Sequence, residues 1–122
     1  MRVYIATKWE AREEAIHLAA IVSQLGCVVM CRWWLETQNT ATQAVLDLEG
    51  VILADVLIIL AKRDFPYKGV YAELGAALAT DTPVWIVGNS LDSCIFTKHP
   101  LVVKFNSVDE MLIDLKDTAS AY

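Results

Sequence analysis

The run VLIILA at residues 56–61 decides the fold of this chain, because it holds six apolar residues without a polar interruption. A strand with one face in water alternates apolar and polar residues, whereas a strand of a parallel sheet, covered on both faces, is apolar almost throughout. Four other stretches have the same continuous character: VYIA at 3–6, CVVMCRWW at 27–34, PVWIVG at 83–88 and LVVKF at 101–105. We therefore predict five strands of a parallel sheet.

Helices are predicted between these strands. Apolar residues recur at helical spacing over 10–25, and Gly26 follows as a natural C-terminal stop. Thr40 and Gln43 have the spacing of a capping box, which begins a helix that runs to Asp55. The last two helices are predicted over 68–80 and 107–115, and the loops over 35–39, 62–69 and 89–100.

Strands and helices alternate over residues 1–122, which predicts one α/β domain with a doubly wound, flavodoxin-like parallel sheet. Right-handed crossovers favour the strand order 2-1-3-4-5, with helices on both faces. In such folds a ligand binds beyond the carboxyl ends of the strands, at the switch point between the first and third strands. The residues expected at this crevice are Thr7, Lys8 and Trp9, the loop 62–69, and Gly88 with Asn89.

The composition excludes several classes of protein. Hydrophobic residues make up 56% of the 122 residues, an excess that suits a covered sheet or a subunit that hides surface in an oligomer. The longest apolar stretch, 51–61, contains Asp55 and is far shorter than the roughly 20 residues of a membrane span, so no membrane partner is expected. The beginning of the chain lacks the pattern of a signal peptide, which predicts a cytoplasmic protein.

Charge, cysteines and turn motifs restrict the ligand. A net charge of −5 argues against a nucleic acid polymer as partner but leaves room for a small anionic ligand in a local positive pocket. Cys27 and Cys31 are too far apart on one strand to share a zinc ion, so we expect buried free thiols and no metal. The turn after the first strand reads TKWEAR, without GxGxxG or GK[ST], so no cofactor is expected.

Glu73 is the one acid between Lys68 and Asp81, inside the apolar segment KGVYAELGAALAT. We expect it in the first turn of a helix that leaves the crevice, where the helix dipole favours a negative charge. Such a carboxylate should stay ionised, which suits a nucleophile. Acids are also common in first turns simply because they are stable there, so the residue type leaves a structural and a chemical role open.

Other polar and aromatic residues have ordinary structural interpretations. Asp47 shares a predicted helical face with Glu49, which favours a solvated position, and Asp55 at the helix–strand junction suits a cap or turn. Trp33 and Trp34 end the second predicted strand, so we expect their side chains on opposite faces of the sheet.

Four segments of the chain resemble the nucleoside 2-deoxyribosyltransferase family, including its relatives that hydrolyse deoxynucleoside monophosphates. They are VYIATKWEAREEA, DLEGVILADVLIIL, KGVYAELGAALATDTPVWIVG and FTKHPLVVKFNSVDEML, which together span nearly the whole chain. The most specific part is YAELG, where Gly69, Glu73, Leu74 and Gly75 match the family's Gly-x-x-x-Glu-Leu-Gly element.

The resemblance implies roles for three residues in a retaining mechanism. Glu73 would attack C1′ of the sugar and form a covalent glycosyl ester, which an acceptor base or water then cleaves. Tyr4 would hold the nucleophile and the sugar, and Asp47 would hydrogen-bond the substrate and assist departure of the base. The implied substrates are 2′-deoxynucleosides or their monophosphates, bound in addition by Thr7, Lys8, Trp9, Asp64, Gly69 and Asn89.

Family members are oligomers with shared active sites, so we expect a homodimer or larger homo-oligomer in which Asn89 and His99 cross over to a neighbour. The loop before the helix departs from the family. Tyr67 stands six residues before Glu73, where relatives have an Asp or a phosphate-binding Ser, and Asp64 is the acid that could replace it. The Gly-Ser-x-Arg phosphate turn is also absent.

Three classes of function therefore remain open. The first is an enzyme that acts on the N-glycosidic bond, as a transferase or a hydrolase. The second is a non-catalytic module that binds a nucleoside or nucleotide. The third is a doubly wound signalling domain, which the lack of an acidic cluster at the strand ends disfavours.

Overall fold

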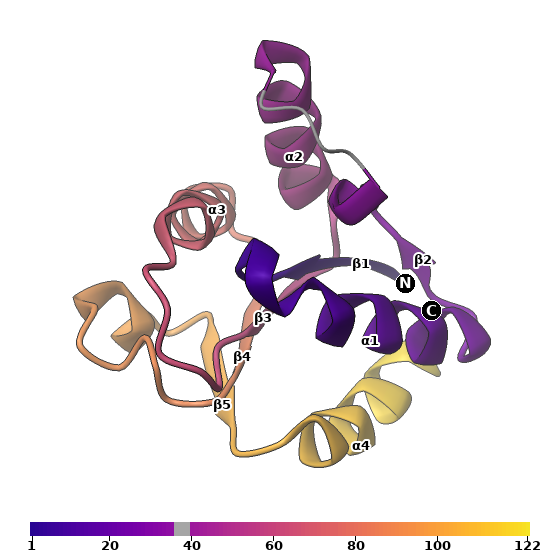
Figure 1. Ribbon diagram of the computed structural model, residues 1–122. Helices are drawn as coiled ribbons and strands as arrows, with labels where there is room; N and C mark the ends of the chain where they lie inside the picture. The colour runs from indigo at the N-terminus through magenta and orange to yellow at the C-terminus, as the bar shows by residue number, and fades with distance from the viewer. Residues whose placement is uncertain (36–39) are drawn as a thin grey trace.

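The computed structural model describes residues 1–35 and 40–122, and its centre is a five-stranded sheet (Figure 1). Every strand pair is parallel, and the order is β2-β1-β3-β4-β5, which confirms the predicted sheet. The strands are β1 (Arg2–Ala6), β2 (Val28–Val29), β3 (Val56–Leu60), β4 (Val84–Val87) and β5 (Val102–Phe105).

Helices cover both faces of the sheet, as predicted. Figure 1 shows α1 and α4 on one side of the strands and α2 and α3 on the other. The α-helices are α1 (Arg12–Gln24), α2 (Ala41–Leu53), α3 (Lys68–Ala79) and α4 (Val108–Ala119), and the 3-10 helices are η1 (Trp9–Ala11), η2 (Trp33–Leu35) and η3 (Ile95–Lys98). None of the described helices is long and apolar enough to cross a membrane.

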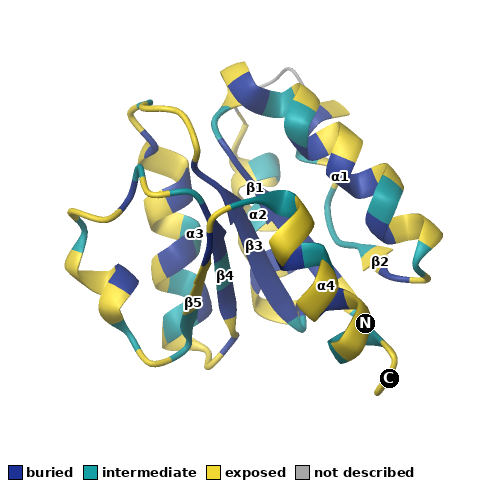
Figure 2. Cartoon of the chain, turned by 90° about the horizontal axis from the view of Figure 1, so that it is seen from below, coloured by how far each residue is buried: buried dark blue, intermediate teal, exposed yellow. Residues whose placement is uncertain are grey.

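Strand β3 explains the unbroken apolar run of its sequence. All five of its residues are buried, and it pairs with β1 on one side and β4 on the other. Its side chains alternate between two cores: Ile58 packs in the core beneath α1 and α4, and Ile59 packs in the core beneath α2 and α3. Figure 2 shows the strand in the dark blue of buried residues. A polar residue on either face of this strand would lose its water without gaining a partner.

The end of α1 and the beginning of α2 have the local features that the sequence predicted. Gly26 follows α1 with φ +88°, a left-handed conformation that glycine adopts without strain. The Thr40 hydroxyl oxygen accepts a hydrogen bond of 3.1 Å from the backbone N–H of Gln43 at the start of α2. The Gln43 side chain does not complete the capping box, because it turns toward the interior of the molecule instead.

The predicted strand over 27–34 is wrong beyond its first residues. The paired ladder covers Val28–Val29 only, because Cys31 takes a left-handed backbone conformation with φ +54°. The chain then turns into η2, where the indole N–H of Trp33 donates to the carbonyl of Ile5 at 2.7 Å.

The two adjacent tryptophans consequently do not alternate across a sheet. The rings of Trp33 and Trp34 instead pack edge to face, with centroids 5.3 Å apart. Leu35, at the beginning of the predicted loop 35–39, belongs to η2, and the other four positions of that loop lie outside the described residues.

The glycine after β4 offers a test of the sheet edge. Gly88 has φ +104°, and a Cβ there would lie 2.5 Å from the carbonyl oxygen of Ala61. We expect Gly88→Ala to lower the free energy of unfolding by at least about 2 kcal/mol, from the left-handed backbone and the clash together. Gly75→Ala, inside α3 where a Cβ meets nothing within 4 Å, should raise it by roughly 1 kcal/mol. Urea denaturation measures both, and a Gly88→Ala protein as stable as the wild type would contradict the expectation.

Candidate active site

Two predicted site residues meet on the face of the sheet covered by α2 and α3. Tyr4 lies in the middle of β1 and is fully buried, and Glu73 projects from α3. The Tyr4 hydroxyl donates a hydrogen bond to Oε2 of Glu73. The lone acid of the apolar segment is therefore paired with the one polar atom of a core tyrosine.

Gly50 makes room for this pair. It is buried in α2, and a Cβ at this position would lie 3.0 Å from two carbons of the Tyr4 ring and 3.1 Å from Cβ of Cys31. Contacts this short would force the tyrosine or the helix to move, so the absence of a side chain allows the ring to lie against α2. Gly50 ends the segment DLEG, and no role was predicted for it from the sequence.

Asp47 lies one turn before Gly50 and is half-buried, whereas its neighbour Glu49 is exposed. Its Oδ1 accepts hydrogen bonds from the side-chain amide of Gln43 at 2.7 Å and from the thiol of Cys31 at 3.1 Å. The solvated position that the helical face favoured is thus wrong for Asp47. Cys27 and Cys31 are both free cysteines as expected, but only Cys27 is buried, whereas Cys31 is half-buried.

Gln43 and Cys31 belong to this site, although neither residue was predicted there. Gln43 had a usable signal, because residues four apart in a helix share a face and it precedes Asp47 by four. Cys31 had none, since its position depends on a left-handed backbone that the apolar run 27–34 concealed.

Burial dominates the acid–base chemistry of the cluster. The pKa of Glu73 is raised to about 7: burial is the main cause, the hydrogen bond from Tyr4 lowers it in part, and the charge of Asp47 adds a smaller increase. Burial also raises the pKa of Tyr4 far above its usual value, with the charge of Glu73 as the next cause. Burial raises the pKa of the Cys31 thiol to about 12, and its hydrogen bond to Asp47 adds to the effect. Tyr4 and Cys31 are therefore protonated donors at neutral pH, while Glu73 is poised between its two forms.

The predicted place of Glu73 in the first turn of its helix is wrong. Helix α3 begins at Lys68, so Glu73 lies in the second turn, where the helix dipole has little effect. The carboxyl group depends on Tyr4 rather than on helix amides, and burial rather than the dipole sets its pKa.

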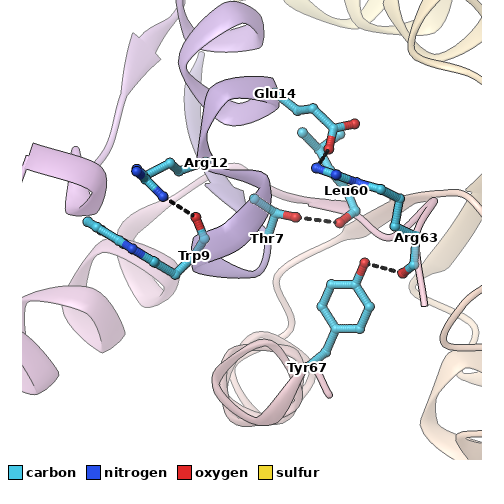
Figure 3. A network of polar contacts seen from close by, with 7 residues as sticks. All are labelled: Thr7, Trp9, Arg12, Glu14, Leu60, Arg63 and Tyr67. Carbon is cyan, nitrogen blue, oxygen red and sulfur yellow. Dashed lines mark hydrogen bonds and ion pairs between the residues drawn. The ribbon is translucent and has the colours of Figure 1, made fainter. Parts of the chain in front are cut away.

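The segment after β1 lies at the switch point of the sheet. Among the described residues, no side chain of this segment forms a hydrogen bond with Glu73. The hydroxyl of Thr7 donates to the carbonyl of Leu60 at 2.8 Å, which joins the ends of β1 and β3 (Figure 3). Lys8 is half-buried at the start of η1. Trp9 is exposed, with the Arg12 guanidinium 4.5 Å from its ring centroid.

The loop after β3 is held by a hydrogen bond within the loop and by an ion pair to α1 (Figure 3). Tyr67 is buried, and its hydroxyl donates to the carbonyl of Arg63 at 2.5 Å. The Arg63 guanidinium forms an ion pair of 2.9 Å with Glu14 on α1. Asp64 is exposed in this loop, and its charge acts on the pKa of Tyr67, whereas the acid that acts on the pKa of Glu73 is Asp47.

The remaining predicted residues lie around the same edge. Gly69 is exposed in the first turn of α3 and faces open space. Asn89 is exposed and lines a recess of about 310 Å³ with Lys62 and Lys104 beyond β4 and β5. His99 lines a wider apolar groove of about 780 Å³ between α3 and the segment around η3. Neither recess is lined by Glu73.

Known structures share this fold. A CMP N-glycosidase, BcmB, from Clostridium botulinum has a TM-score of 0.68 and 18% identity, with 97% of this chain and 99% of that chain covered. A 2-deoxyribosyltransferase from Bacillus psychrosaccharolyticus has a TM-score of 0.68 and 15% identity over 91% and 90% of the two chains. A conserved protein from Enterococcus faecalis has a TM-score of 0.63 and 17% identity, with 98% of each chain covered.

No protein-family model matches the chain, and no curated protein matches it. At identities of 15% to 18% the structural likeness establishes the fold. One of the three structures is a 2-deoxyribosyltransferase, the kind of protein that the sequence resemblance named.

The raised pKa of Glu73 predicts how stability depends on pH. Between about pH 4.5, the ordinary value, and pH 7, the folded protein binds more protons at this site than the unfolded chain. The contribution of Glu73 to the free energy of unfolding should therefore decrease as pH rises through this window. We expect Glu73→Gln to remove roughly 1 to 3 kcal/mol of that decrease. Urea denaturation from pH 4 to 8 measures it, and identical pH profiles for the two proteins would contradict the burial of the acid.

Proposed function

We propose that this protein cleaves or transfers the N-glycosidic bond of 2′-deoxynucleosides or their monophosphates through a covalent glycosyl–Glu73 intermediate. The observation that carries the proposal is the pairing of Glu73 with the buried Tyr4 hydroxyl, beside Asp47. The YAELG element and the shared fold with a CMP N-glycosidase and a 2-deoxyribosyltransferase support it.

The geometry indicates which oxygen of Glu73 attacks in the first step. The Tyr4 hydroxyl occupies Oε2 of Glu73, so Oε1 is the oxygen available to attack C1′ of the sugar. As the new C–O bond forms, the bond from C1′ to the base nitrogen breaks, and its electron pair leaves with the base. Asp47 assists departure by relaying a proton from solvent to the base, which leaves neutral, and Asp47 is then ionised again.

The second step restores the enzyme. Water or an acceptor base attacks C1′ from the face that the first base left, its proton passes through Asp47 to solvent, and the ester bond to Glu73 breaks. The carboxylate is regenerated, and the sugar keeps its configuration after two inversions. Since the attacking form is ionised, the proposed rate increases with pH around the pKa of Glu73, which is about 7.

The alternative proposal is a non-catalytic module that binds a nucleoside or nucleotide in the same crevice. The observation that favours it is Tyr67, which is buried with its hydroxyl bonded to the Arg63 carbonyl. The loop therefore presents no carboxylate or hydroxyl of residue 67 toward Glu73, where the resembling family has a polar side chain.

Release of free base separates the two proposals. We expect wild type to release base from at least one member of a panel of deoxynucleosides and 5′-monophosphates, with the matching ribonucleotides included. Glu73→Ala should reduce the rate by at least about 1,000-fold, because the nucleophile is lost. Glu49→Ala, an exposed acid on α2, should stay within about twofold of wild type. Chromatography of the base measures this, and a new nucleoside formed with an added base identifies a transferase.

Saturable binding of a nucleoside without base release from any substrate would favour the alternative. In that case Glu73→Ala should leave the affinity nearly unchanged.

We also propose that the protein is a homo-oligomer in which the face bearing α2, α3 and η3 meets a second copy and completes the site. Large apolar side chains are exposed on this face, although water penalises contiguous apolar surface. They are Val45, Leu46, Leu48, Ile52 and Leu53 on α2 and Ile95 and Phe96 on η3. Asn89 and His99 lie in the segment that would cross to the neighbour's crevice.

The oligomer can be tested on opposite faces of the sheet. Phe96 is 61% exposed on the proposed contact face, and Ile113 is 64% exposed on α4 across the sheet. We expect Phe96→Asp to raise the dissociation constant of the oligomer at least about tenfold, because an aromatic side chain that the contact would bury is lost. Ile113→Asp should have no such effect. Light scattering coupled to size exclusion measures the mass, and a wild-type monomer at all concentrations would contradict the proposal.

A further inference from the structure

The hydrogen bonds of Asp47 are arranged unevenly on its two oxygens. Both recorded bonds, from the Gln43 amide and the Cys31 thiol, end on Oδ1. Within residues 1–35 and 40–122, no protein donor reaches Oδ2. One oxygen is thus anchored by two donors from two different segments, and the other is left for a ligand.

We propose that Cys31 and Gln43 are positioning residues that hold Asp47 with Oδ2 directed at the departing base. This inference rests on the proposed function and extends it, because the resemblance assigned no role to either residue. Neither residue contacts the reacting atoms in this scheme; both act through Asp47.

The backbone at Cys31 supports a role beyond packing. Its φ of +54° is uncommon for a residue with a Cβ, and a glycine would adopt it without strain. The same conformation ends β2 and brings the thiol to Asp47, 16 residues further along the chain. The thiol keeps its proton, so it serves as a donor.

The two donors are both neutral, and this suits an acid that has to handle a proton. A lysine or arginine at either position would add a positive charge beside Asp47. An amide and a thiol orient the carboxyl group without adding charge. The charge of Asp47 acts on the pKa values of Tyr4, Cys31 and Glu73, which are its titratable neighbours in this cluster.

A purely structural role makes a different prediction. If the cluster only fastens the beginning of α2 to residue 31, its loss lowers stability and impairs every substrate equally. If it positions Asp47 for leaving-group departure, its loss matters only where the leaving group needs a proton. A 4-nitrophenyl 2-deoxyriboside has a leaving group stable as an anion, so the comparison with a natural deoxynucleoside separates the two roles.

The experiment compares variants that keep or remove the donor. Cys31→Ala removes the donor but keeps the Cβ and its backbone strain, Cys31→Ser restores a donor, and Gln43→Ala removes the second donor. Gln24→Ala at the exposed end of α1 is the matched control. We expect both donor deletions to lower kcat on the natural substrate roughly 10- to 100-fold, with little change on the nitrophenyl substrate. Cys31→Ser should recover most of the loss.

Equal losses on the two substrates, or no loss on either, would overturn the positioning role. If wild type releases neither base nor nitrophenolate, the proposed function itself fails. The ¹³C resonance of the Asp47 side-chain carboxyl then decides the positioning separately. A resonance that moves in both donor deletions and returns in Cys31→Ser supports the anchoring of Asp47, and one that stays in place in all variants overturns it.

Discussion

A carboxyl group that leaves water needs a hydrogen-bond donor, and the rest of the site depends on how Glu73 obtains one. The donor is Tyr4, whose ring is fully buried in the central strand β1. That ring can lie against α2 only because Gly50 has no side chain. The Tyr4 side chain therefore connects three elements, β1, α2 and α3. The acid is held in place by the core of the protein rather than by a surface loop.

The electrostatics follow from this burial. Away from water the ionised form of Glu73 loses solvation, and its pKa increases to about 7 although Tyr4 stabilises the charge. The neighbouring donors, Tyr4 and Cys31, have raised pKa values for the same reason and keep their protons. Glu73 is thereby an acid with a pKa near neutral pH, beside two donors that keep their protons. Such a contrast between neighbours is typical of sites that separate a nucleophile from its proton donors.

The edge of the sheet supplies the frame for this group. Thr7 joins the ends of β1 and β3, and Arg63 with Glu14 fastens the loop after β3 to α1. These contacts hold the two segments that border the switch point, where doubly wound folds bind ligands. Thr7, which the resemblance proposed for substrate binding, has a structural role here because its hydroxyl connects two strand ends.

The sequence by itself determined the parallel sheet, because strands buried on both faces are apolar throughout and such runs alternate here with helical patterns. It also singled out Glu73, since a lone acid in an apolar helix stands out, and the resemblance placed Tyr4 and Asp47 beside it. Tertiary structure alone decided the rest. The left-handed turn at Cys31 shortens β2 and delivers a thiol to Asp47, and no local pattern encodes a contact between residues 16 apart. The pKa of Glu73 is likewise a property of the packed core, because desolvation depends on neighbours brought together from β1, α2 and α3.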